Sequence, residues 1–458
     1  MSRPKKTSVP IAPARRAALD ALVRCASNKN VFLDEAMEDA ASSHCLDSRD
    51  RRLAMEIAYG STRFCAKLDH ILNAYLPKGV QSLPETVKQI LRMTAYQILH
   101  LTKIPAHACI HDAVELARVT GNPHLSKLVN AVLRGLVRGD RPVALPEWQS
   151  DPVGHLEIVH SHPRHLVESW LELWPPDQVH EFCRFNNTPA PLYARLNPLK
   201  EIPADLRDEM EPADLGIPNC VRLNLKASPM QSRIVSEGWV TIQDPAAMLV
   251  PLLLSLQPGM RVWDVCAAPG GKTTHCAEIL GDTGQVVASD VSLSRLRLLH
   301  AAGAGLRPAS TSLDIICADG LHPPWDREFQ GFDAILLDAP CTGWGTLRRH
   351  PDLRWRLSPS DPQRLGDLSY TLLESVCRSL RTGGVLVYAT CTLSRRENQD
   401  VIRRFLESRP GWRLETVTPF LPQPFRSIVA QEGWISIFPP QAQIDGMFAA
   451  RLRNNSSA

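Results

Sequence analysis

The feature that most constrains the fold is a strand–turn–helix pattern in residues 261–274. Apolar residues alternate over 262–265 and predict a buried strand, Ala267–Gly271 predict a tight turn, and a helix is expected from Lys272. The glycines let a ligand approach the backbone closely, and the first turn of a helix offers free N–H groups. The sequence therefore predicts a cofactor-binding turn around which a larger domain is built.

The spacing within this turn limits the kind of cofactor. A phosphate-binding Walker loop needs a glycine five residues before the triplet Gly271–Thr273, but Cys266 occupies that position. The Gly-x-Gly-x-x-Gly spacing of dinucleotide folds is not supplied either. We therefore expect a nucleoside cofactor without a dominant phosphate, with a purely structural strand–turn–helix as the alternative.

Three later segments predict strands with an aspartate at or just after their ends, namely 285–290, 314–320 and 332–338. Strands that alternate with helices predict a parallel, doubly wound sheet, whose ligands bind at the carboxyl ends of the strands. Asp290 is placed to accept the ribose hydroxyls of a nucleoside, and Asp319 lies where an adenine amino group is expected. Helix capping explains any one such aspartate, but three at successive strand ends, Asp338 being the third, indicate a site.

Two cysteines are also expected at the carboxyl ends of strands. Cys341 comes just after the strand that ends at Asp338, and Cys391 ends the next predicted strand, which begins at Gly384. Adjacent strands would place both thiols beside the cofactor. A thiolate is a soft, strong nucleophile that can add to an electron-poor ring carbon. The other ten cysteines, Cys266 included, are interpreted as small buried residues.

The loop after Cys341 has a composition that suits RNA, with Arg348, Arg349, His350, Arg354 and Trp355. Arginines donate to phosphates, and an indole offers a surface for stacked bases. Further basic residues follow Cys391 at Arg395, Arg396, Arg403 and Arg404. A solvated helix face would give the same pattern, so this second group leaves both interpretations open.

Length and composition bound the domain organisation. With 458 residues the chain is expected to form about three domains, and 44% hydrophobic with 22% charged residues are globular values. We expect an all-α helical bundle over residues 10–142, a small α+β module over 150–244, and the α/β domain over 245–455. The net charge of +3 is weak evidence for a nucleic-acid partner.

Neither a metal site nor a membrane segment is expected. The 12 cysteines are scattered without a Cys-x-x-Cys pair, which indicates a reducing compartment. His160, His162 and His165 are close in sequence, but no cysteine or carboxylate stands at ligand spacing. Met1–Lys6 is not followed by an apolar core, and no apolar run is long enough to cross a membrane. The sequence predicts a soluble, cytoplasmic protein.

Several motifs resemble those of the RNA (cytosine-5-)methyltransferase family, namely Cys266–Lys272, Asp338–Cys341, Arg348–Asp352 and Tyr388–Cys391. Asn186–Leu192 and Gln243–Ala246 resemble the pre-catalytic module of these enzymes, and Ile110–Ala117 and Leu128–Arg134 resemble the closing helices of the RNA-binding NusB-like domain. Together these motifs are similar to bacterial 16S-type ribosomal RNA (cytosine-5-)methyltransferases with an N-terminal NusB-like domain. Ile444–Ala449 matches the family's closing hairpin strand, which implies a seven-stranded, Rossmann-like sheet.

The resemblance implies a cofactor, S-adenosyl-L-methionine, and its binding residues: Cys266, Ala267, Ala268, Pro269, Gly270, Gly271, Lys272, Asp290, Asp319 and Asp338. It also implies that Cys391 adds to carbon 6 of a flipped-out cytosine and that Asp338 assists at ring nitrogen 3. Cys341 would then remove the proton at carbon 5 or release the covalent adduct.

The implied substrate is a cytidine of small-subunit ribosomal RNA, and the expected protein is a monomer. A transfer RNA substrate and a non-catalytic RNA-binding ribosome-assembly factor are the alternatives. The chain departs from the family's pattern at Thr342 and Thr392, where many relatives have serine, and at Trp344, which replaces a small residue. The run Arg395–Asn398 also has a base in place of one acid. Because both hydroxyls are kept, the chemistry is expected to survive.

Overall fold

The computed structural model describes residues 11–225, 229, 232–281, 283–305, 312–325, 329 and 331–456. Met1–Lys6 and residue 10, the expected start of the helical domain, lie outside these residues. The chain divides into two compact units, which are described separately. The first comprises residues 1–188 and 349–356, and the second comprises 189–348 and 357–458.

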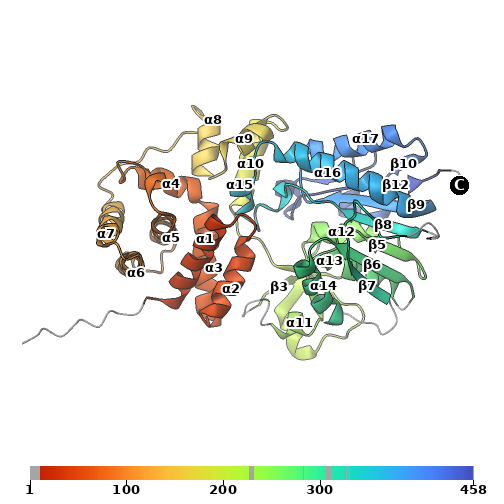
Figure 1. Cartoon of the computed structure of the whole chain (residues 1–458), viewed down its shortest axis with the longest axis horizontal. Coiled ribbons are helices and arrows are strands. Elements are labelled where there is room, and N and C mark those ends of the chain that lie inside the picture. The colour runs from red at the N-terminus through yellow and green to blue at the C-terminus, as the bar shows by residue number, and fades with distance from the viewer. Residues whose placement is uncertain are drawn as a thin grey trace, which may run out of the picture. The chain divides into compact units, whose positions relative to one another are not determined.

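The first unit begins with the expected bundle of helices (Figure 1): α1 (Pro13–Ser27), α2 (Leu33–Ser43), α3 (Ser48–Arg63), α4 (Cys65–Asn73), the 3-10 turn η1 (Val80–Ser82), α5 (Glu85–His100), α6 (Ala106–Val119) and α7 (Pro123–Arg138). The predicted apolar stripe of α5 faces the core, since Val87, Ile90 and Leu91 are fully buried. In α7, Asn122 caps the first turn and Gly139 adopts the left-handed conformation that ends the helix. The helical prediction is confirmed.

The first unit continues with α8 (Pro152–Gly154), the π-helical turn η2 (His155–Val159), α9 (Arg164–Leu171) and α10 (Pro176–Asn186), and it includes α15 (Leu353–Arg356). Trp170 of α9 is fully buried and meets Phe182 of α10 edge-on, with ring centroids 4.9 Å apart. This aromatic contact joins the two helices into one small core.

The second unit opens with a four-stranded antiparallel sheet built from β1 (Tyr193–Leu196), β2 (Met210–Pro212), β3 (Cys220–Leu223) and β4 (Val240–Ile242). The strand order is β2-β3-β1-β4. Two short helical segments, η3 (Ala204–Glu209) and α11 (Arg233–Ser236), connect the strands. The sequence predicted β1, β3 and β4 but not β2, which has only three residues and ends in Pro212.

The large sheet contains β5 (Arg261–Asp264), β6 (Gln285–Asp290), β7 (Ser312–Cys317), β8 (Phe332–Asp338), β9 (Leu380–Thr390), β10 (Trp412–Glu415), β11 (Ile435–Ile437) and β12 (Met447–Asn454). Its main path is β10-β12-β9-β8-β5-β6-β7, and β11 pairs with β12. The seven strands of the main path match the expectation, and β11 is an eighth. The sheet is mixed rather than parallel throughout, because β12 runs antiparallel to both β9 and β10.

Helices cover both faces of the large sheet (Figure 1): α12 (Pro245–Leu252), α13 (Gly271–Leu280) and α14 (Leu293–Gly305) on one face, and α16 (Asp361–Val376) and α17 (Gln399–Ser408) on the other. Val262 and Leu336 pack with α12 and α13, whereas their chain neighbours Trp263 and Ile335 pack with α16 and α17. Since alternate residues of a strand point to opposite faces, both faces are buried, and the strands are apolar throughout. The doubly wound prediction is confirmed.

The remaining short segments of the second unit are η5 (Trp344–Thr346), η6 (Cys377–Ser379), η7 (Arg395–Glu397), η8 (Thr418–Phe420), α18 (Gln423–Arg426) and α19 (Pro439–Ala442). Within the described part of the chain, every helix is too short or too polar to cross a membrane.

Candidate active site

The predicted cofactor turn connects β5 to α13. Gly270 has a φ of +112°, a backbone conformation that disfavours residues with a side chain. A Cβ atom at this position would also lie 2.8 Å from Cγ of Leu299 in α14. Gly270 is therefore required both by the backbone of the turn and by the close packing of α14.

Asp290 ties this turn to the tip of β6. One carboxylate oxygen accepts a hydrogen bond from the N–H of Ala268 at 3.3 Å, and the other accepts one from the N–H of Ser292 at 2.9 Å. Each carboxylate oxygen can accept a further bond, so Asp290 keeps capacity for a ligand. Asp319 follows the neighbouring strand β7, where its carboxylate accepts a hydrogen bond from Leu321 N–H and its side chain is 44% exposed.

Lys272 and Asp338 form a close ion pair. The Lys272 ammonium lies 2.6 Å from an oxygen of Asp338, so the turn after β5 is linked to the end of β8. Burial alone would lower the pKa of Lys272, but attraction to the Asp338 carboxylate raises it above its ordinary value. Lys272 is therefore held as a cation next to the last residue of β8.

The two cysteines lie together, as expected for the exits of adjacent strands. The Sγ atoms of Cys341 and Cys391 are 3.4 Å apart, and β8 and β9 pair in parallel. The hydrogen bond to Cys391, together with burial and the negative charge of a Cys391 thiolate, raises the pKa of Cys341 well above its ordinary value. Burial likewise raises the pKa of Cys266, in keeping with its interpretation as a structural residue.

The sequence analysis missed Glu397, which supports the cysteine loops. Its carboxyl oxygens accept hydrogen bonds from Thr342 N–H at 2.7 Å and from Thr342 Oγ1 at 2.8 Å. Thr342 and Thr392, the residues after the two cysteines, share a hydrogen bond of 2.7 Å between their hydroxyls. Burial raises the pKa of Glu397 to about 7. Its position in the run Arg395–Asn398 gave no signal of this contact.

The sequence analysis also missed Asp264. It is the last residue of β5, and so has the same place on its strand as the predicted aspartates have on or just after theirs. It is fully buried, and one carboxyl oxygen accepts a hydrogen bond from Thr273 Oγ1 at 2.6 Å. The other oxygen, Oδ1, is buried without a hydrogen-bond partner among the described residues. Burial raises the pKa of Asp264 to about 7. Counting an acid at the end of the first strand would have found it.

The cofactor turn is braced by a buried arginine from the small sheet. Arg195 of β1 forms an ion pair with Glu278 of α13 at 2.7 Å and donates to the carbonyl of Gly271 at 3.1 Å. It also bonds the side chain of Gln243, which opens the predicted motif Gln243–Ala246. The small sheet therefore fixes the first turn of α13.

The predicted RNA-binding loop is corrected by the structure. Arg348 and Arg354 are buried and donate to backbone carbonyls, of Pro189 and Ser161 respectively. Trp355 donates its indole N–H to the carbonyl of Thr62 at 2.8 Å. Residues 349–356 belong to the first unit, whereas Arg348 belongs to the second. Arg348 and Arg354 thus take part in internal packing. The prediction that they contact phosphates is wrong, because their guanidinium groups are buried and bonded to backbone carbonyls.

Comparison with known proteins agrees with this architecture. Residues 251–453 match the family described as 16S rRNA methyltransferase RsmB/F, residues 12–138 match the NusB family, and residues 162–225 match the ferredoxin-like domain of RsmF/B-like methyltransferases. A relative from Synechocystis sp., named probable ribosomal RNA small subunit methyltransferase B, is 34% identical over 94% of this chain and 97% of its own. The chain belongs to the RsmB/F methyltransferase family.

Other relatives of this methyltransferase cover most of its length. Ribosomal RNA small subunit methyltransferase B of Vibrio cholerae is 32% identical over 90% of this chain and 91% of its own. The crystal structure of the protein PH0851 matches with a TM-score of 0.83 at 24% identity, covering 98% of this chain and all of that one, and it supports the fold.

Proposed function

We propose that this methyltransferase transfers a methyl group from S-adenosyl-L-methionine to carbon 5 of a cytidine in small-subunit ribosomal RNA. The observation that carries the proposal is the pair of thiols, Cys341 and Cys391, 3.4 Å apart at neighbouring strand ends. The names of the relatives supply the class of RNA. We also propose the domain division 10–142, 150–244 and 245–455, and a monomer located in the cytoplasm with its RNA substrate.

The residues of the turn fit S-adenosyl-L-methionine. Gly270 gives the turn the positive φ that it needs, and Asp264 Oδ1 is a buried acceptor without a partner among the described residues. The proposed binding residues are Cys266, Ala267, Ala268, Pro269, Gly270, Gly271, Lys272, Asp290, Asp319 and Asp338. When bound, this cofactor supplies an electrophilic methyl group on a sulfonium.

The proposed mechanism begins at Cys391. Its thiolate forms a bond to carbon 6 of the cytosine, and the carbon 5–carbon 6 electron pair moves to make carbon 5 nucleophilic. The Lys272 ammonium can pass a proton to Asp338 across their ion pair, and Asp338 shares that proton with ring nitrogen 3, which stabilises the developing charge. After carbon 5 has gained the methyl group, Cys341, which loses its proton to solvent once Cys391 is bonded to the ring, takes the carbon 5 proton as a thiolate. The electron pair of that carbon–hydrogen bond re-forms the carbon 5–carbon 6 double bond, the carbon–sulfur bond to Cys391 breaks, and nitrogen 3 returns its proton to Asp338.

The base must leave the helical stack to reach these thiols, at a cost of a few kcal/mol that is smallest for an unpaired base. We therefore expect a cytidine in a loop or junction. The helical bundle, which matches the NusB family, is proposed to contribute RNA binding.

The test is bisulfite sequencing of ribosomal and transfer RNA from cells that lack the gene, complemented with wild type, Cys391→Ala or Cys183→Ala. Cys183 is a fully buried cysteine of α10 and serves as the matched control. We expect one small-subunit rRNA cytosine to be protected by wild type and Cys183→Ala but not by Cys391→Ala. Protection restored only in transfer RNA would select the other substrate, and no protected cytosine in either pool would leave the non-catalytic assembly factor.

A further inference from the structure

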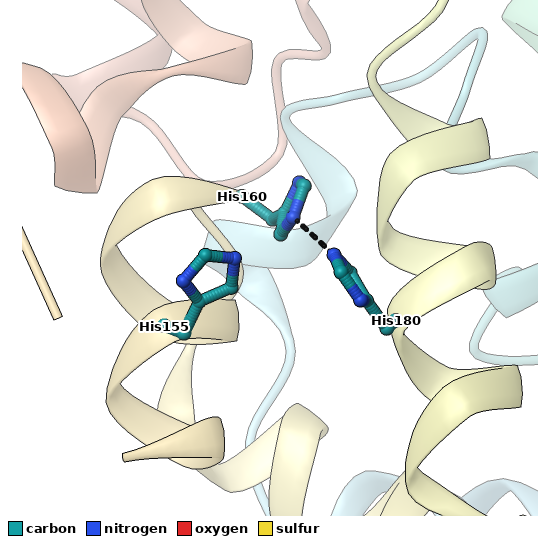
Figure 2. A group of neighbouring side chains, drawn as sticks. All are labelled: His155, His160 and His180. Atoms are coloured by element: carbon teal, nitrogen blue, oxygen red, sulfur yellow. Dashed lines mark hydrogen bonds between the residues drawn. The ribbon is translucent and has the colours of Figure 1, made fainter. Parts of the chain in front are cut away.

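Three histidines from separate positions in the sequence gather in the first unit (Figure 2). His155 begins η2, His160 follows its end, and His180 lies on α10. One ring nitrogen of each lies within 4.8 Å of the others, and all three side chains are partly buried. None of these residues takes part in the proposed methyl transfer.

The π-helical turn brings the first two histidines onto one face. The N–H of His160 bonds the carbonyl of His155 at 3.3 Å, five residues earlier, which is the π-helical hydrogen bond. In an ordinary α-helix, residues five apart point about 140° away from each other, because each residue advances by about 100°. The wider turn instead leaves the two rings with centroids 5.2 Å apart. Turns of this kind are rare and often occur at functional sites.

The hydrogen bonds aim ring nitrogens at a common point. Nδ1 of His155 lies 2.8 Å from the carbonyl oxygen of Pro146, so it carries the proton and leaves Nε2 with a free lone pair. A backbone carbonyl that orients the second nitrogen in this way is the usual support of a metal-binding histidine. Nε2 of His160 faces Nε2 of His180 at 3.0 Å, as the dashed line in Figure 2 shows.

Burial favours the neutral form of the His160 and His180 rings, which is the form that binds metals. Burial, followed by repulsion from His180 and His155, lowers the pKa of His160 to about 3. Burial also lowers the pKa of His180. Arg184 and Lys67 add smaller repulsions at His160. At His180 the repulsions come from His155 and Arg184, and attraction to Asp177 partly offsets them. Trp148 packs against the His180 ring, with centroids 4.4 Å apart, and fixes its orientation.

We propose that His155, His160 and His180 form a binding site for a divalent transition metal, with Zn²⁺ as the fitting ion and a fourth position left for water. Three imidazoles without a thiolate suit Zn²⁺, whose bonds to nitrogen are about 2.0–2.1 Å long. Tetrahedral ligands at that distance are roughly 3.4 Å apart. Side-chain rotations that bring nitrogens 4.8 Å apart closer by about 1.4 Å, and that separate the His160 and His180 nitrogens slightly from 3.0 Å, would close the site.

This proposal departs from the sequence-based expectation of no metal. That expectation considered His160, His162 and His165, of which only His160 belongs to the group. His162 is fully buried and packs edge-on against Trp170 instead. A bound ion would clamp η2 to α10 and so stabilise the second half of the first unit.

The experiment uses the full chain, free of any histidine tag and stripped with a chelator, in a calorimetric titration with Zn²⁺ alone. We expect one ion per chain, an affinity at least about 100-fold weaker in His160→Gln and His180→Gln, and a higher unfolding temperature with the ion only where it binds. His124→Gln is the matched control, because His124 is exposed on α7, and it should bind as wild type does.

A second measurement protects the result against variants that fail to fold. Wild-type chain titrated with Co²⁺ should develop the intense visible bands of a four-coordinate ion, and Zn²⁺ should remove them. The proposal is overturned if wild type takes up neither ion stoichiometrically, or if folded His160→Gln and His180→Gln bind as tightly as His124→Gln.

Discussion

At the residue scale, the chemistry depends on which groups are allowed to ionise. Burial raises the pKa of two carboxyls, Asp264 and Glu397, to about 7, although both side chains accept hydrogen bonds. Asp338 instead has the Lys272 cation 2.6 Å away. The surroundings therefore give carboxyl groups of one domain different roles. Asp264 and Glu397 act as buried hydrogen-bond acceptors, and Asp338 forms an ion pair.

Glu397→Gln tests this view through stability. The folded pKa of Glu397 is about 7 and its ordinary value is 4.5, so the folded protein holds more protons between these pH values. Glu397 should therefore cost wild type up to about 3 kcal/mol of stability as pH rises from 4.5 to 7. Glutamine should remove this part of the loss and leave the part that comes from Asp264. Urea unfolding at pH 5 and pH 8 measures it. Glu407→Gln, on the exposed side of α17, is the control and should follow wild type.

Cys341→Ala tests the division of work between the thiols. If Cys341 takes the carbon 5 proton, its loss should leave the RNA attached to Cys391 and slow turnover by at least about 100-fold. A denaturing gel with labelled RNA should then show a protein–RNA adduct. Cys391→Ala, alone or combined with Cys341→Ala, should give no adduct. An adduct that persists without Cys391 would place the nucleophile elsewhere.

The sequence predicted the location of a site residue where that location follows from the residue's position at the end of its own strand. Cys341 and Cys391 could be paired in advance because neighbouring parallel strands end at the same edge. Glu397 could not be found this way, since its role depends on the loop after another strand. The group of three histidines depends on a π-helical turn and on α10, and neither the turn nor the contact between them has a sequence pattern that we could use.

At the element scale, the cofactor turn combines a strained backbone with tight packing, and the two can be separated. Gly270→Ala would place a Cβ at a φ of +112° and 2.8 Å from Leu299. Gly281→Ala, at the end of α13, has a φ of +61° and nothing within 4 Å. We expect Gly281→Ala to cost about 1–3 kcal/mol of unfolding free energy from its backbone conformation alone (φ +61°, ψ −134°), and Gly270→Ala to cost more because its Cβ also meets Leu299.

The same pair of variants also tests the function of the turn. Binding of S-adenosyl-L-methionine, measured by calorimetry, should weaken in Gly270→Ala and stay unchanged in Gly281→Ala. Equal stability and equal affinity of the two variants would show that the turn does not need Gly270.

Strands were predictable where the sequence has an apolar run of several residues. β6 and β8 have the bounds expected from their apolar runs, because they are buried on both faces. β2 and β11 have three residues each, too few for a periodic pattern, and they form only by pairing with β3 and β12. The antiparallel direction of β12 comes from its pairing, which the apolar pattern of a single strand does not encode.

At the scale of the whole molecule, the segment that follows Cys341 and Arg348 in the chain belongs to the other unit. The chain leaves the second unit after Arg348, contributes residues 349–356 to the first, and returns at Leu357. In the first unit Asp352 accepts a hydrogen bond from Leu33 N–H at 3.2 Å, and Arg356 donates to the carbonyl of Lys29 at 2.7 Å. The segment that follows the Cys341 loop in the chain therefore links the two units in sequence and adds contacts that stabilise the first unit.

Arg354 is the residue at which this link can be tested. It is fully buried, and burial together with Arg63 lowers its pKa to about 9. Its guanidinium donates to Asn187 Oδ1 at 3.0 Å and to the Ser161 carbonyl at 3.2 Å. Arg354→Met removes a buried charge, which is favourable, but it leaves both acceptor oxygens without a donor. The second effect should dominate, because each buried acceptor without a donor costs about 1–3 kcal/mol.

We therefore expect Arg354→Met to lower the unfolding free energy of the first unit by about 2–3 kcal/mol, seen by scanning calorimetry of the full chain as a lower unfolding temperature. Arg364→Met is the control, since Arg364 pairs with Asp361 on the exposed side of α16 and should cost under about 1 kcal/mol. Arg354→Lys should not restore wild-type stability, because a single ammonium cannot reproduce the planar fork that reaches both oxygens. A full rescue by lysine would mean that charge alone, rather than this hydrogen-bond geometry, secures the segment.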